Sequence, residues 1–344
     1  MQTIAEVAAH VRELRLRHPF ATSRDRQARL VSRPIRIAVR LDDGATGLGE
    51  ATPTRYVTGE TEATVLDALA RAREALAGQD IRRLGRLTRR LAEALPNDLT
   101  ARAGVEMALY HLSAQLAGES LWERFGGAAP SIRTDVTLPL GADIEARVFE
   151  ARAQGFDTFK VKVGPDLDAD IRLLERISAA APGARLRIDA NQAFRPADAL
   201  SLIEHAVRLP IEVELLEQPV PAEDLDALQE VAAASPAPVY ADEAVRTPRE
   251  AYAVLSRTQV AGINVKLLKS GVSGALDIVA LARAAGRRLM IGCMLESRLG
   301  IGFSVAFACG TGAFLHADLD SHLLLTEEGP NPYFQECGPE LRPG

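Results

Sequence analysis

The sequence lacks the features of a membrane, secreted or nucleic-acid-binding protein. No apolar run approaches the ~20 residues that a membrane-spanning helix needs. Residues 1–6 do not have the basic and then apolar layout of a signal peptide. The net charge of −6 and a pI near 5.7 give no basic footprint for a nucleic acid. We therefore expect a cytoplasmic protein that has neither a membrane nor a nucleic acid as its partner.

Cysteine is also scarce. The three cysteines, Cys293, Cys309 and Cys337, are odd in number, and their spacing fits no metal site. Reduced thiols are the simplest interpretation, and they agree with a cytoplasmic location. Cys293 ends a predicted strand, but no histidine is placed to activate it as a nucleophile. We therefore expect this residue to act as a small buried hydrophobic side chain.

The composition that remains is ordinary for a globular protein, with 47% hydrophobic and 25% charged residues in a chain of 344. Residues 1–125 are predicted to form a small α+β domain, because strands come first and helices follow. Polar loops are expected at 21–26 and 52–59, on either side of a glycine-rich turn at 44–50. Strands are predicted at 12–17 and 35–41, and helices at 62–76, 81–94 and 101–116.

Residues 126–321 repeat a strand and a helix. Right-handed crossovers make such strands parallel, and eight of them favour a closed barrel in which no strand is left as an edge. The tail at 322–344 is rich in proline and glycine, shows no periodicity, and is long enough to pack back on the N-terminal domain. The predicted strands lie at 132–138, 157–163, 185–189, 213–217, 239–242, 261–266, 288–293 and 313–317, with helix-like runs such as 169–180, 197–208 and 275–285 between them.

The stretch at 158–164, which contains most of the second of these strands, alternates apolar and cationic residues. The alternation predicts a half-buried strand with Lys160 and Lys162 on one face. On an ordinary exposed sheet these would be two solvated lysines. Three later strands each end in a carboxylate, and this indicates a functional role for the two lysines.

These carboxylates are Asp189, Glu217 and Asp242, and the following strand ends in Lys266. The four strand ends are about 25 residues apart, which is the period of a β/α unit. In a parallel barrel all of these side chains meet at the carboxyl ends of the strands, where such barrels have their active sites.

Three converging carboxylates predict a metal site. They offer hard oxygen ligands of the kind that Mg²⁺ takes while it keeps positions open for a substrate. Without a cation they would repel one another, and at least one would be protonated. The alternative is that they pair with arginines. We expect this less, because we place the nearby Arg187 on the opposite face of its strand.

The lysines then have a chemical role. Lys162 and Lys266 are predicted to lie on opposite sides of the barrel mouth, with the metal-binding strands between them. A neighbouring cation such as Lys160 lowers the pKa of a lysine, so that a fraction is neutral and can act as a base. A metal would stabilise the enediolate that forms when a proton leaves the carbon next to a carboxylate. One lysine would remove the proton, and the other would return one from the opposite face.

The motifs at 160–162, 188–192, 217–219, 241–243 and 264–266 together resemble the muconate-lactonizing subgroup of the enolase superfamily. The resemblance covers essentially the whole chain. It implies a (β/α)7β TIM-like barrel with an N-terminal capping domain. It also implies Mg²⁺ bound by Asp189, Glu217 and Asp242, and an acid/base pair of Lys162 and Lys266 that Lys160 assists.

The subgroup contains several reactions, so the substrate must be inferred from other residues. Asp318 and Asp320 end the eighth strand, face the same way and would suit a substrate ammonium group. The alternative is a pair of solvated or helix-capping acids. An Asp-x-Asp at this place resembles the dipeptide epimerases, in which it holds the N-terminal amine. The segment at 292–297 fits the same subfamily, with Glu296 as a further substrate contact.

Side-chain specificity is expected from the two polar loops, which would close over the mouth. Arg24 resembles the cation that meets the glutamate side chain in L-Ala-D/L-Glu epimerases, and Tyr56 would lie on the other wall. The alternative for Arg24 is a solvated loop arginine. One departure from the family pattern follows Lys266, where the sequence to Val272 is one residue shorter than the usual two-glycine loop.

The sequence therefore predicts a Mg²⁺-dependent isomerase. The leading hypothesis is a dipeptide epimerase that inverts the α-carbon of the C-terminal residue, with L-Ala-D/L-Glu as substrate. The same machinery would also serve an N-acyl amino acid racemase, a cycloisomerase or an o-succinylbenzoate synthase. A third hypothesis is a barrel that binds a ligand or serves structurally, without catalysis. A homo-oligomer is compatible with the sequence, which does not fix the oligomeric state.

Overall fold

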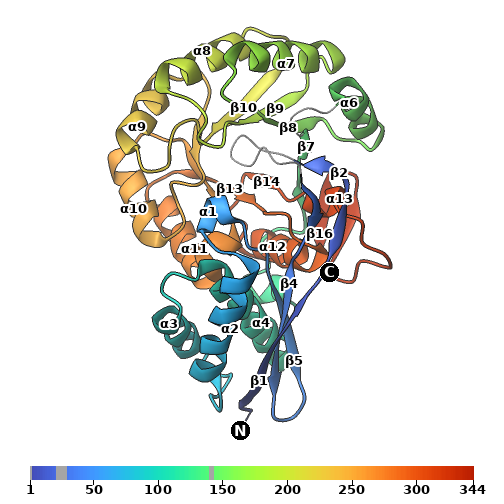
Figure 1. The fold of residues 1–344 in the computed structure, drawn as a ribbon, viewed down its shortest axis with the longest axis vertical. Helices are drawn as coiled ribbons and strands as arrows, with labels where there is room; N and C mark the ends of the chain where they lie inside the picture. Colours follow the sequence, from blue (N-terminus) through green and yellow to red (C-terminus); the bar gives the residue numbers. More distant parts are fainter. Residues whose placement is uncertain (1, 21–28, 139–142) are drawn as a thin grey trace.

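The computed structural model describes residues 2–20, 29–138 and 143–344 (Figure 1). The chain begins with an antiparallel sheet of order β1-β4-β5, against which two helices pack, and a third helix packs on those two. Its members are β1 (Ile4–Val11), β4 (Ile35–Leu41), β5 (Thr46–Ala51), α2 (Glu62–Leu76), α3 (Leu84–Ala94) and α4 (Leu99–Ala117). A separate ribbon pairs β2 (Leu14–Phe20) with β3 (Arg29–Ser32), and short helices follow at α1 (Arg55–Thr58) and α5 (Leu121–Arg124).

The glycine-rich segment is only partly a turn. Residues 42–45 make the turn, but Gly47 and Gly49 lie within β5 and face α4. A Cβ atom added to Gly49 would lie 2.0 Å from the carbonyl oxygen of Gly104 in that helix. These two glycines therefore allow a close approach of strand and helix, which the sequence analysis interpreted as turn chemistry alone.

The larger part of the chain is a barrel. An eight-stranded parallel sheet runs in the order β7 to β14, and an isolated bridge between Thr134 and Ala317 brings its two outer strands together, so the barrel is nearly closed. The strands are β7 (Val136–Leu138), β8 (Thr158–Lys162), β9 (Arg185–Asp189), β10 (Glu212–Glu217), β11 (Val239–Ala241), β12 (Gly262–Val265), β13 (Arg288–Gly292) and β14 (His316–Asp318).

Helices alternate with these strands and surround them, as Figure 1 shows for α7 to α10. They are α6 (Ile144–Ala153), α7 (Leu167–Ala180), α8 (Pro196–Ala206), α9 (Leu225–Ala234), α10 (Pro248–Arg257), α11 (Leu267–Ala284) and α12 (Arg298–Thr311). The predicted (β/α)7β architecture is confirmed. Within the described residues, no helix is long and apolar enough to span a membrane.

Strand β8 is buried on both faces, whereas its alternation predicted a half-buried strand. Phe159 and Val161 pack into the apolar layer under the helices, and Lys160 and Lys162 point into the barrel. The prediction of one wet face was wrong because the barrel closes around that face. The alternation itself was correct.

The C-terminal segment has structure that its sequence did not indicate. After α13 (Ser321–Leu324) it forms β15 (Phe334–Cys337) and β16 (Glu340–Pro343), and β16 pairs with β6 (Ile132–Arg133). It also contacts the N-terminal strands, since Arg12 and Glu327 form an ion pair at 2.8 Å. The division of the chain into domains at residue 125 stays a prediction.

The unusual loop after Lys266 is held by α4. Gly271 has φ of 70° and interrupts α11, and the helix resumes immediately after it. The buried Glu106 of α4 accepts a hydrogen bond from the backbone N–H of Ser273 at 2.8 Å. Arg102, one turn earlier, donates to the carbonyl oxygen of Ser270 at 3.0 Å. The N-terminal helices thus fix the segment that follows Lys266.

Candidate active site

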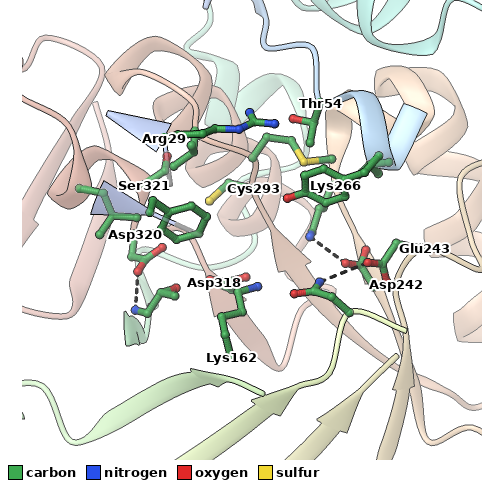
Figure 2. Close-up of a pocket in the computed structure, with 18 residues that line it drawn as sticks. Arg29, Thr54, Lys162, Asp242, Glu243, Lys266, Cys293, Asp318, Asp320 and Ser321 are labelled. Carbon is green, nitrogen blue, oxygen red and sulfur yellow. Dashed lines mark hydrogen bonds and ion pairs between the residues drawn. The ribbon is translucent and has the colours of Figure 1, made fainter. Parts of the chain in front are cut away.

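A cavity lies at the carboxyl ends of the barrel strands (Figure 2). Its floor comes from the barrel, and its upper wall comes from β2, β3 and the segment around α1. The lining residues are Phe20, Arg29, Thr54, Tyr56, Val57, Thr137, Lys162, Asn191, Asp242, Glu243, Lys266, Cys293, Met294, Leu295, Asp318, Asp320, Ser321 and Leu324.

The three carboxylates predicted to bind metal stand side by side. Asp189 and Glu217 end neighbouring strands in direct register, and Asp242 follows the next strand. All three are buried. Burial, and then the nearby Asp189 carboxylate, raise the pKa of Glu217 to about 8. Negative charge is therefore costly at this place unless a cation offsets it.

Lysine ammonium groups supply that positive charge. The Nζ atom of Lys160 lies 2.8 Å from Glu217 and 3.1 Å from Asp189. Lys162 lies 2.6 Å from Asp189, and Lys266 lies 2.8 Å from Asp242. Lys160 is buried behind the cavity surface, whereas Lys162 and Lys266 line it.

A fourth lysine, Lys269, was missed by the sequence analysis. Its ammonium group contacts a carboxylate oxygen of Asp242 at 2.5 Å and the backbone carbonyl oxygen of Asn264 at 3.0 Å. The residue is fully buried, and burial lowers the pKa of its ammonium group. The only sequence signal was its position three residues after Lys266.

A neighbouring cation is not the dominant influence on the pKa of these lysines. Burial by itself lowers the pKa of each ammonium group, but the carboxylates outweigh it and raise the pKa of Lys160, Lys162 and Lys266. The positive charge of Lys160 lowers the pKa of Lys162, but the negative charge of Asp189 raises it by more. The effect of the carboxylates on the pKa values exceeds that of burial because they lie within hydrogen-bond distance of the ammonium groups.

Arg187 corrects another expectation. Residues 187 and 189 are two apart in a strand, so they share a face, and the predicted opposite orientation was wrong. Arg187 points into the barrel and pairs with Asp135 at 2.9 Å and Glu214 at 2.7 Å. It contacts none of the three predicted metal ligands at the distances of an ion pair, because it lies one layer deeper.

Asp320 lies across the cavity from Asp242, and Asp318 lies between them (Figure 2). Asp318 pairs with Lys160 at 2.5 Å, and Asp320 accepts a hydrogen bond from the backbone N–H of Thr137 at 2.5 Å. Burial and the adjacent Asp318 carboxylate raise the pKa of Asp320 to about 6. The buried Asp135, which the sequence analysis did not identify, lies close behind this pair.

Two sets of three carboxylates are candidates for a metal site. Among the described residues, only Asp135, Asp318 and Asp320 bring three such oxygen atoms within 4.8 Å of one another. Arg187, Lys160 and the N–H of Thr137 already engage these acids. In the other set, lysine ammonium groups form ion pairs with Asp189, Glu217 and Asp242. Its three hard oxygen donors from adjacent strands, with one carboxylate disfavoured as an anion, fit a small divalent cation better.

Of the remaining predicted residues, the structure describes Tyr56, Glu296 and Cys293. Tyr56 lines the upper wall, and the guanidinium of Arg29 lies 5.9 Å from the centre of its ring. Arg24 is outside the described residues. Glu296 does not line the cavity: its carboxylate accepts a hydrogen bond from the backbone N–H of Met294 at 2.9 Å, and burial raises its pKa to about 8. Cys293 lines the cavity, and burial together with nearby carboxylates raises the pKa of its thiol.

Comparison with known proteins now identifies the family. Residues 5–126 match the N-terminal domain of the mandelate racemase / muconate lactonizing enzyme family, and residues 143–336 match its enolase C-terminal domain-like part. The chain belongs to the mandelate racemase / muconate lactonizing enzyme family of the enolase superfamily. The resemblance and the fold class inferred from the sequence are therefore confirmed.

Relatives in this family are epimerases. The L-Ala-D/L-Glu epimerase of Thermotoga maritima is 38% identical over 90% of this chain and 90% of its own length. The substrate-liganded L-Ala-D/L-Glu epimerase of Bacillus subtilis superimposes with a TM-score of 0.96 at 32% identity, covering 99% and 96% of the two chains. The dipeptide epimerase of Enterococcus faecalis, complexed with Mg and L-Leu-L-Tyr, gives 0.94 at 29% identity, covering 99% and 97%. Epimerases are isomerases, and that predicted enzyme class is confirmed.

Proposed function

We propose that this protein is a Mg²⁺-dependent dipeptide epimerase that inverts the α-carbon of the C-terminal residue, with L-Ala-D/L-Glu as its best substrate. One observation carries the proposal. A single cavity is lined by two lysines from strands on different sides of the barrel, by Asp242, and by the Asp318–Asp320 pair. Figure 2 shows Lys162 and Lys266 approaching the cavity from different directions.

Asp189, Glu217 and Asp242 would hold the metal. When bound, Mg²⁺ supplies the positive charge that stabilises the developing negative charge on the substrate carboxylate. The protein's own residues do the proton chemistry. Lys162 and Lys266 would remove and return the α-proton on opposite faces of the carbon, each from its Nζ atom. Lys160, which contacts three carboxylates from three strands, would keep the site's charges in place.

Asp318 and Asp320 would bind the substrate's N-terminal ammonium group. Two buried carboxylates suit a charged amine, which would donate charge-assisted hydrogen bonds that a neutral acyl group cannot donate. This favours a dipeptide over an N-acyl amino acid. A cycloisomerase or synthase substrate would likewise bring no cation to this end of the cavity.

The preference for a C-terminal glutamate rests on the upper wall. Arg29 lines the cavity there together with Tyr56, and a forked guanidinium binds a carboxylate in two places. The relatives from Thermotoga maritima and Bacillus subtilis that act on L-Ala-D/L-Glu agree with this assignment. A contact from Arg24 stays a prediction.

The first test is proton NMR of L-Ala-L-Glu with the protein and Mg²⁺ in D₂O. We expect loss of the C-terminal α-proton signal together with growth of the L,D diastereomer. L-Ala-L-Gln is the matched control, because it differs only in the side-chain carboxylate, and it should react at least tenfold more slowly. Equal rates would contradict the role of the upper-wall arginine. No exchange with any dipeptide in a panel would contradict the epimerase.

Replacing Asp320 by Asn tests the amine site. A charged hydrogen bond to the ammonium group contributes about 1.5–3 kcal/mol, so kcat/KM for L-Ala-L-Glu should fall by roughly one to two orders of magnitude. The control substrate is N-acetyl-L-glutamate, which has no ammonium group, and any turnover of it should not fall. An equal loss with both substrates would show that Asp320 acts on the structure of the site and not on the amine.

A further inference from the structure

Three residues of the barrel mouth have a backbone conformation that side chains other than glycine rarely adopt. Asn191, Gln192 and Gln218 have φ of 42°, 70° and 34°, and in the part of the chain that the structure describes no other non-glycine residue has a positive φ. Gln218 directly follows Glu217, and Asn191 and Gln192 come two and three residues after Asp189. The chain therefore bends in an unusual way where the candidate metal ligands project.

Gln218 is the most constrained of the three. It is fully buried, and each of its polar groups has a partner. Its side-chain Oε1 accepts hydrogen bonds from the backbone N–H groups of Asp242 at 2.9 Å and Ala244 at 3.1 Å. Its Nε2 donates to the carbonyl oxygen of Val220 at 2.9 Å. One amide thus joins the end of β10 to the segment that carries Asp242.

The backbone of Gln218 extends the same connection. Its N–H donates to the carbonyl oxygen of Tyr240 at 2.9 Å, and its carbonyl oxygen accepts from the N–H of Gln192 at 2.8 Å. Three successive strand ends, those of β9, β10 and β11, are therefore linked through this residue. These are the strand ends that position the three carboxylates.

We propose that Gln218 is a positioning residue that fixes the separation of Glu217 and Asp242 so that both reach one cation. The inference rests on the proposed function, because it assumes that these carboxylates bind Mg²⁺. An amide satisfies all of these groups: two N–H groups of the segment that carries Asp242 need an acceptor, and the carbonyl of Val220 needs a donor. A carboxylate lacks the donor, and an aliphatic side chain lacks both.

Gln192 offers a matched control. It has the same side chain and also a positive φ, and its Oε1 accepts a hydrogen bond from the backbone N–H of Ala222 at 3.0 Å. That hydrogen bond joins Gln192 to the loop after β10 and does not involve the segment that carries Asp242. A substitution at 192 therefore tests for any general effect of removing a buried amide at this end of the barrel.

The test compares the wild-type chain with Gln218→Met and Gln192→Met by calorimetric titration with Mg²⁺ alone. Residues that orient metal ligands typically change affinity by 10–100-fold, so the dissociation constant of Gln218→Met should rise by about that factor. We expect less than a threefold change for Gln192→Met. Equal affinity of wild type and Gln218→Met would overturn the inference. Absence of Mg²⁺ binding by the wild type would instead overturn the proposed function.

A second variant covers the case in which Gln218→Met does not fold. Gln218→Glu keeps the acceptor for Asp242 and Ala244 and loses only the donor to Val220. Its Mg²⁺ affinity should stay within threefold of the wild type, while its melting temperature without metal falls. A tenfold weaker affinity would show that the acceptor does not set the position of Asp242, and it would overturn the inference.

Discussion

At the scale of single residues, Lys160 is the centre of the site. Its ammonium group lies within 3.1 Å of carboxylates from Asp189, Glu217 and Asp318, which belong to three different strands. Burying a lysine is unfavourable unless it is paired, and here three partners compensate for the lost water. Removing one member of such a buried cluster typically costs about 3–5 kcal/mol, since the other charges are left without a partner.

Glu296 gives a residue-scale prediction about pH. Its carboxyl has an ordinary pKa of 4.5, which burial raises to about 8. Between these values the unfolded chain has lost the proton and the folded chain keeps it, so the free energy of unfolding should fall as pH rises from about 5 to 8. Glu296→Gln has no proton to lose, so its stability relative to the wild type should increase across this range.

Urea unfolding of both proteins at pH 5 and pH 8 measures this difference. The exposed Glu93→Gln is the control and should track the wild type at both values. Parallel pH dependence of Glu296→Gln and the wild type would contradict the prediction and would point to an ionised Glu296 in the folded protein.

At the scale of elements, β5 and α4 depend on a close approach of two backbones. A methyl group on Gly49 would lie 2.0 Å from the carbonyl oxygen of Gly104 and 2.9 Å from the backbone nitrogen of Ala108. Backbone atoms cannot move aside as a flexible side chain can. The helix would have to shift away from the strand, and the same helix also holds the loop that follows Lys266.

We therefore predict that Gly49→Ala destabilises the protein by about 1–3 kcal/mol, the usual cost of overpacking. Gly85→Ala is the matched control, because it lies in helix α3 and an added Cβ would meet nothing within 4 Å. Alanine favours a helix, so this control should be unchanged or more stable by about 0.5–1 kcal/mol. Thermal unfolding of both variants measures this difference in stability. A Gly49→Ala protein as stable as the control would show that the strand and the helix separate easily.

At the scale of the whole molecule, the site has a wall from each end of the chain. The floor is the barrel, the upper wall includes Phe20 and Arg29 near the N-terminus, and Leu324 comes from the C-terminal segment. An isolated bridge between Leu16 and Leu325 joins the two ends beside the cavity. Substrate and metal would therefore bind among parts of the chain that only the complete fold brings together.

Metal binding should stabilise this assembly as a whole. A ligand that binds only the folded chain at 100 times its dissociation constant adds about 2.7 kcal/mol to the free energy of unfolding. We expect the melting temperature to rise on addition of Mg²⁺ and to return to its original value with EDTA. NaCl at the same ionic strength is the control and should not reproduce the rise. No difference between Mg²⁺ and NaCl would contradict a divalent site.

The sequence by itself determined the barrel and the identity of its strand-end residues. A β/α unit has a fixed length, so regular spacing is enough to locate Asp189, Glu217, Asp242 and Lys266 at one end of a parallel sheet. Alternation along β8 likewise located Lys160 and Lys162 on one face. These are local properties, because each depends only on neighbouring residues in the chain.

Only the tertiary structure decided which charges meet. The pairing of Arg187 with Asp135 joins residues 52 apart, and the hydrogen bond from Ser273 to Glu106 joins residues 167 apart. No local pattern reports such pairs, because they form only when the barrel closes and the N-terminal helices pack on it. The raised lysine pKa values have the same origin. They depend on the distance from each ammonium group to the carboxylates around it, which the fold sets and the order of residues does not.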